Sequence, residues 1–64
     1  MEKAYLMQDI MNLEECIKFL DSAKKALNDV DNTDYLYAEI HNLKEKVIDL
    51  KIQKEIEFEK EAEL

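Results

Sequence analysis

The residues of this chain that could take part in chemistry are few and lie far apart. His41 stands one helical turn before Glu45 and one turn after Tyr37, so a helix would place these three side chains on one face. They could supply part of a metal site or an acid–base pair. The chain has no second histidine and no Cys-x-x-Cys motif to complete a tetrahedral zinc site. We therefore interpret His41 as a polar surface residue.

The only cysteine, Cys16, follows Glu14 and Glu15. A reactive thiol needs positive charge nearby to favour the thiolate. Lys18 is the only obvious cation close to Cys16, and Asp9 opposes it. We expect Cys16 to be a small, partly buried side chain rather than a nucleophile or metal ligand. A single cysteine also fits a reducing compartment.

Other sites with a recognisable motif are excluded by their missing residues. There is no Glu-x-x-His motif for a carboxylate-bridged metal pair, and no glycine for a phosphate-binding loop. The acids Asp29, Asp31 and Asp34 lack the glycine and final glutamate of a calcium-binding loop. We expect no catalytic activity, no metal and no cofactor.

The charge balance argues against direct binding to nucleic acid. Sixteen acidic residues outnumber nine basic ones, giving a net charge of −7, and all nine are lysines. Proteins that bind phosphate backbones present clustered positive charge instead. Lysine without arginine, glycine or proline is consistent with a low-GC source such as a firmicute, a phage or a mobile element. Residues 1–10 contain no apolar run longer than four residues, so we expect neither a signal peptide nor a membrane span. We expect a cytoplasmic protein, in the host cytoplasm if a phage encodes it.

Any functional side chain must be positioned by helices, because the 64 residues include no Gly and no Pro. Apolar residues at alternating spacings of four and three predict a first helix over residues 2–28. Its apolar seam comprises Leu6, Ile10, Leu13, Ile17, Leu20 and Leu27, with Lys24 at one seam position.

The chain has one predicted break, over residues 29–33, where Asn, Asp and Thr favour turns and helix caps. Asn32 or Thr33 is expected to cap the second helix, and Asn28 or Asn32 to adopt the left-handed conformation. The second helix is predicted over residues 34–60, and fraying over residues 61–64. Its seam comprises Leu36, Ile40, Leu43, Val47, Leu50 and Phe58, with Lys54 at one seam position.

Two long helices joined by so short a loop must run antiparallel. We therefore predict an all-α protein with one domain over residues 1–64, an antiparallel helical hairpin with a short acidic loop. Further large apolar side chains lie outside the two seams and would stay in water in a single hairpin. They are Tyr5, Met7, Met11, Phe19, Tyr37, Ile48, Ile52 and Ile56. Burying the largest of them would contribute on the order of 1.5–3 kcal/mol each, so we predict that they form an interface and that the hairpin dimerises into a four-helix bundle, a form of coiled coil.

This surplus apolar surface is the main indication of function. Our first hypothesis is a non-enzymatic protein–protein interaction module, a small homo-oligomeric regulator, adaptor or inhibitor of phage or mobile-element type that also binds another protein. The second is an acidic decoy that imitates nucleic acid and blocks a DNA- or RNA-binding protein, suggested by the charge of −7. The third is a purely structural oligomerisation coiled coil.

Overall fold

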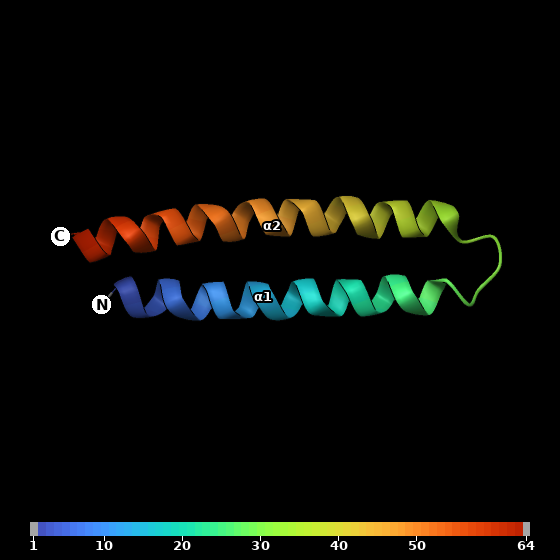
Figure 1. The fold of residues 1–64 in the computed structure, drawn as a ribbon, viewed down its shortest axis with the longest axis horizontal. Coiled ribbons are helices and arrows are strands. Elements are labelled where there is room, and N and C mark those ends of the chain that lie inside the picture. Colours follow the sequence, from blue (N-terminus) through green and yellow to red (C-terminus); the bar gives the residue numbers. More distant parts are fainter. Residues whose placement is uncertain (1, 64) are drawn as a thin grey trace.

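A computed structural model describes residues 2–63 of the chain, with side chains for residues 3–61. It contains two helices, α1 (Glu2–Leu27) and α2 (Asp34–Glu63). They lie side by side and antiparallel, with both chain ends at one end of the molecule and the loop at the other (Figure 1). We call these the open end and the loop end. The predicted all-α antiparallel hairpin is confirmed.

The helix boundaries differ slightly from the predicted ones. α1 ends at Leu27, one residue earlier than expected. α2 continues to Glu63, whereas we predicted fraying after Lys60, and Leu64 lies outside the described residues. Acids near a helix C-terminus are unfavourable by about 0.3–1 kcal/mol each at most exposed sites. Glu and Ala are strong helix formers, and their propensity carries the helix through residues 61–63.

The loop closes α1 with three tight backbone turns. Asn28 N–H donates to Lys25 O at 3.2 Å, Asp29 N–H to Ala26 O at 3.3 Å, and Val30 N–H to Leu27 O at 3.0 Å. These bonds span three residues instead of four, as is common where a helix ends. Asn32 then adopts a left-handed conformation with φ of 63°, one of the two positions predicted for it. Asparagine tolerates this conformation better than most residues.

Thr33 occupies the capping position of α2, as one of the two predicted alternatives. Its backbone carbonyl accepts hydrogen bonds from the N–H groups of Leu36 and Tyr37, both at 3.0 Å. Its hydroxyl, however, points back to the other helix. Oγ1 lies 3.1 Å from Leu27 O and 2.9 Å from Val30 O, and its single hydrogen can be shared between them. Thr33 therefore joins the end of α1 to the start of α2.

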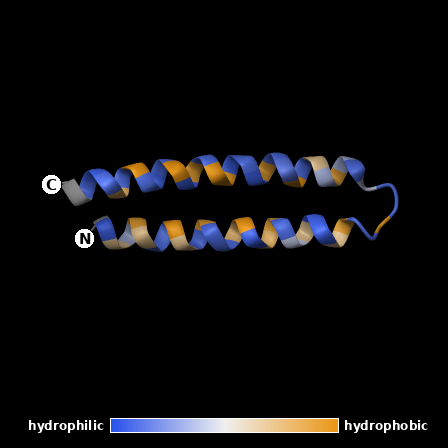
Figure 2. Cartoon of the chain, in the orientation of Figure 1, coloured by the Kyte–Doolittle hydropathy of each residue, from blue (hydrophilic) through white to orange (hydrophobic). Residues whose placement is uncertain are grey.

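Over the residues that the structure describes, the hairpin is a thin rod without an enclosed core. Its dimensions are 52 × 14 × 11 Å and its radius of gyration is 15.0 Å, against about 11 Å for an average compact domain of this length. Among the side chains that the structure describes, none is fully buried. Figure 2 shows hydrophobic and hydrophilic segments alternating along both helices. Within residues 2–63, neither helix has the length and apolar character needed to cross a membrane.

Candidate interaction surfaces

Three lysines of α2 line the contact between the two helices. Lys44, Lys51 and Lys54 are among its better-covered side chains, with exposed fractions of 21%, 26% and 29%. Each reaches an acid on α1. Lys44 Nζ lies 2.6 Å from Asp21, Lys51 Nζ 3.8 Å from Glu14, and Lys54 Nζ 3.7 Å from Asp9. The stems of the lysines pack against α1 while their ammonium groups extend to the edges of the contact.

This line of lysines corrects part of the predicted seam. Leu43 and Leu50 were assigned to the contact with α1, but their exposed fractions are 50% and 43%. α2 is rotated so that lysine stems, rather than these two leucines, face α1. The rotation brings three lysines against three acids in antiparallel order, and it leaves Leu43 and Leu50 on an outer surface.

The ion pair between Asp9 and Lys54 marks one face of the hairpin. Side chains three, four or seven residues apart share one side of a helix. Tyr5 precedes Asp9 by four residues and Leu50 precedes Lys54 by four, so both lie on this face. Tyr5, Asp9 and Lys54 also line one shallow, open hollow of about 430 Å³. By the same spacing the face includes the following residues, which we call the leucine face: Tyr5, Cys16, Phe19, Ala23, Leu43 and Leu50.

The other ion pairs mark the opposite face. Glu14 and Asp21 of α1 meet Lys51 and Lys44 there, and Lys51 also lies 4.0 Å from Glu55. Spacings of three, four and seven residues from these ion pairs place further apolar side chains on the same side. We call this surface the ion-paired face, with the apolar residues Met7, Met11, Tyr37, Ile48, Ile52 and Ile56. Its charged residues run along the middle of the face, between the two helices.

The eight predicted interface residues are therefore divided between two faces. Tyr5 and Phe19 lie on the leucine face, with exposed fractions of 70% and 68%. The other six lie on the ion-paired face, where Ile48 is half-buried against α1 and the rest are exposed.

The apolar spacing did not predict that Leu43 and Leu50 lie at the surface. One pattern in the sequence could have indicated their exposure. The three lysines of α2 match, in antiparallel order, the acids Asp9, Glu14 and Asp21 of α1.

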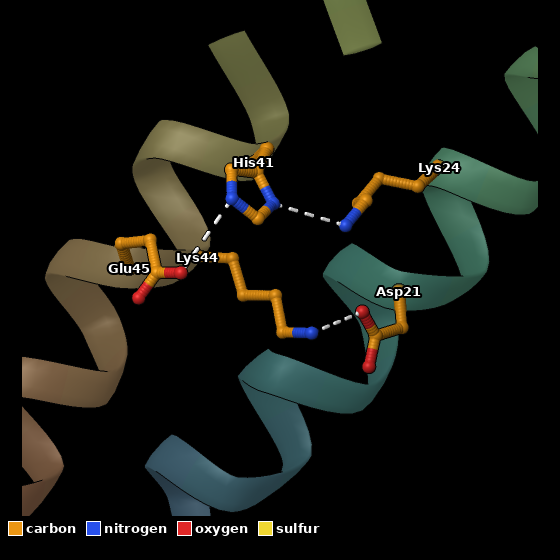
Figure 3. A network of polar contacts seen from close by, with 5 residues as sticks. All are labelled: Asp21, Lys24, His41, Lys44 and Glu45. Atoms are coloured by element: carbon orange, nitrogen blue, oxygen red, sulfur yellow. Dashed lines mark hydrogen bonds and ion pairs between the residues drawn. The ribbon is translucent and has the colours of Figure 1, made fainter. Parts of the chain in front are cut away.

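A polar cluster lies on the ion-paired face at the loop end (Figure 3). Lys24 Nζ is 3.2 Å from Nδ1 of His41, and Nε2 of His41 is 3.5 Å from Glu45. An ammonium group can only donate, so Nδ1 of His41 is the acceptor in this hydrogen bond. Lys24 also lies 5.0 Å from the centre of the Tyr37 ring, a cation–π contact. The predicted trio of Tyr37, His41 and Glu45 thus shares one face, where Tyr37 and His41 contact Lys24 and Glu45 contacts His41.

The same cluster sets the ionisation of one carboxyl group. The hydrogen bond from Lys44 lowers the pKa of Asp21 below its ordinary value of 3.8, and the charges of Lys44, Lys24 and Lys25 add to this while burial opposes it. Within residues 2–63, no three His, Cys, Asp or Glu side chains gather in a group that could hold a metal ion. Figure 3 shows an arrangement of ion pairs and hydrogen bonds that joins α1 to α2.

Comparison with known proteins adds no relative to this description. No protein-family model, no curated protein and no solved structure matches the chain.

Proposed function

We propose that this protein is a non-enzymatic interaction module that assembles with copies of itself and presents the assembly to another protein as a small regulator, adaptor or inhibitor. One observation carries the proposal. Large apolar side chains stand half-exposed on both faces of the hairpin, while none of the described side chains is fully buried. A single hairpin would leave the apolar side chains of both faces in water. Contiguous exposed apolar surface is typical of interaction sites.

The energetics of so small a chain support association. A chain of ~60 residues buries only about 60% of the surface that its unfolded form exposes, and such chains commonly need a disulfide, a metal or a partner. Cys16 is the only cysteine, so no disulfide can form within one chain. Completing the burial of Phe19, Leu43 and Leu50 would add part of the roughly 1.5–3 kcal/mol that each large apolar side chain contributes. Association with another chain is the remaining way to bury these side chains and obtain that free energy.

Sedimentation equilibrium at micromolar concentration tests the proposal. We expect a helical species whose mass is at least twice the 7.6 kDa of one chain. A fully helical species of 7.6 kDa that unfolds cooperatively would refute it, since the hairpin would then be stable with both faces in water.

A second candidate function rests on the distribution of charge. Three of the nine lysines form ion pairs between the helices, so their charges are used within the hairpin. Each of these ion pairs also uses one acid, so thirteen acids and six lysines remain outside them and the net charge stays at −7. An elongated acidic rod of this kind is suited to imitate nucleic acid and to occupy a basic protein surface.

Salt dependence separates the two candidates. Attraction between exposed charges is screened within ~8 Å at physiological ionic strength, so binding of an acidic decoy to a basic partner weakens steeply as salt is added. Self-association through apolar side chains holds or strengthens under the same conditions. Sedimentation in low and in high sodium chloride, with and without a basic DNA-binding protein, measures both effects.

A further inference from the structure

We infer that the leucine face is covered by a second copy of this chain, and that the ion-paired face stays exposed to solvent in the assembly. The inference rests on the proposed function and deepens it, because it assigns self-association to one of two apolar faces. The occupant is a second hairpin, laid face to face on the first to form a four-helix bundle.

The exposed area fits a second copy. The chain exposes 5162 Å², whereas a compact monomer of 7.6 kDa is expected to expose about 4,300 Å². The excess is ~900 Å², and a stable protein interface buries about 800 Å² per partner. One further hairpin along one face is thus enough to bring the exposed area of each chain to the usual value.

The charges decide which face is covered. On the ion-paired face, the ion pairs of Asp21 with Lys44 and of Glu14 with Lys51 lie along the middle. A second hairpin seated there would remove these charges from water, at a cost of several kcal/mol per ion that their mutual attraction only partly offsets. The ion pairs in that position therefore disfavour burial of this face under a second hairpin.

The leucine face presents the opposite situation. Its ion pair, Asp9 with Lys54, lies towards the open end. From there to the loop, the strip between the helices carries Cys16 and Ala23 from α1 and Leu43 and Leu50 from α2. Phe19 stands at the edge of this strip, 68% exposed. Covering these side chains removes apolar surface from water. The charged residues on the same side of α2, Glu39 and Lys46 by spacing and Glu57 in the hollow beside Asp9 and Lys54, are long enough to extend to the edge of a covering hairpin.

Cys16 provides a test that needs no substitution. Its thiol is half-buried in a single hairpin and lies within the strip that the second copy would cover. We expect alkylation of Cys16 by iodoacetamide to slow at least tenfold as the concentration of native protein rises through the range of assembly. The control is a Cys16→Ser, Met11→Cys variant, whose thiol lies on the ion-paired face and should react at a rate independent of concentration. Protection of the thiol at position 11, with Cys16 remaining reactive, would overturn the inference.

A matched pair of substitutions on α2 gives a second readout. Leu43 and Ile52 have nearly equal exposed fractions, 50% and 48%, but lie on opposite faces. We expect Leu43→Asp to weaken self-association by about a hundredfold or more, because two acids enter the covered strip of a dimer. Ile52→Asp should leave it within about threefold. The milder Leu43→Asn tests the same point if Leu43→Asp does not fold.

The outcomes distinguish this inference from the proposed function. If the wild-type chain has the mass of a monomer, the proposed function fails, and the inference fails with it. If the wild type assembles but Ile52→Asp disrupts it and Leu43→Asp does not, self-association stands and the assignment of the face is wrong.

Discussion

At the scale of single residues, Thr33 shows how a short loop without glycine can hold two helices together. Its carbonyl accepts the first hydrogen bonds of α2, and its hydroxyl lies within hydrogen-bond distance of Leu27 O at the end of α1 and of Val30 O in the loop. Carbonyl groups at a helix end have no partner within the helix and must be satisfied from elsewhere. The hydroxyl of Thr33 thus forms its hydrogen bonds with the end of α1 and the loop, and not with α2, the helix that Thr33 caps.

Replacing Thr33 by Val keeps the shape of the side chain and removes the hydroxyl. We expect Thr33→Val to lower the free energy of unfolding by about 1 kcal/mol, the usual contribution of one hydrogen bond. Urea denaturation at a fixed protein concentration measures this value. Thr33→Ser, which keeps the hydroxyl, is the control, and equal loss in the two variants would mean that the hydroxyl contributes nothing.

Asp21 makes stability depend on pH. Because the hydrogen bond from Lys44 lowers its pKa below 3.8, the folded hairpin holds this proton less tightly than the unfolded chain. The resulting stabilisation is present above the unfolded pKa and is lost as the pH falls through the folded one.

Asp21→Asn should therefore reduce stability at neutral pH and weaken its decline between about pH 5 and pH 2. Urea denaturation across this range measures both changes. Asp31→Asn, a substitution in the loop, provides the control. An undiminished decline in Asp21→Asn would show that the pairing with Lys44 does not stabilise the fold.

At the scale of the helices, the contact between α1 and α2 is made partly of lysine stems. Lys51 is 74% covered, with its ammonium group between Glu14 and Glu55. Its methylene groups supply packing, and its charge adds an ion pair that is partly exposed and therefore weak.

Lys51→Met keeps the stem and removes the charge, so we expect a change in unfolding free energy within about 0.5 kcal/mol. Lys51→Asp removes the stem and adds a third acid beside Glu14 and Glu55, and it should cost about 2 kcal/mol or more. Chemical denaturation of the two variants decides the point. Equal losses would show that the charge of Lys51, and not its stem, holds the helices together.

The sequence predicted the helices well because their causes are local. The spacing of Leu6, Ile10 and Leu13 indicates a helix wherever the chain goes, and the cluster of Asn and Asp at residues 28–34 leaves one place for a turn. The rotation of α2 about its own axis was not predicted. Leu43 and Lys44 are adjacent in the sequence. Which of them faces α1 depends on whether an acid of α1 lies opposite, at the same position along the hairpin axis. That is a property of the pair of helices and not of either one.

The faces of the hairpin could be predicted only in part for the same reason. Tyr5 and Phe19 were identified as surplus to the seam, and both are exposed. Their grouping with Leu43 and Leu50, and their separation from Ile52 and Ile56, follow from the rotation of α2.

At the scale of the whole molecule, the described part of the chain is a rod 52 Å long and 11 Å thin, and none of its described apolar side chains is fully buried. We propose that this chain is folded because copies of it associate. Association makes the midpoint of thermal unfolding depend on protein concentration, because unfolding then releases separate chains. Folding of an independent hairpin carries no such dependence.

Thermal unfolding followed by circular dichroism over a hundredfold range of protein concentration measures this dependence. We expect the midpoint to rise by several degrees across the range, and the species at the upper end to have at least twice the 7.6 kDa mass of one chain. A midpoint that stays constant, with a mass of 7.6 kDa throughout, would contradict it.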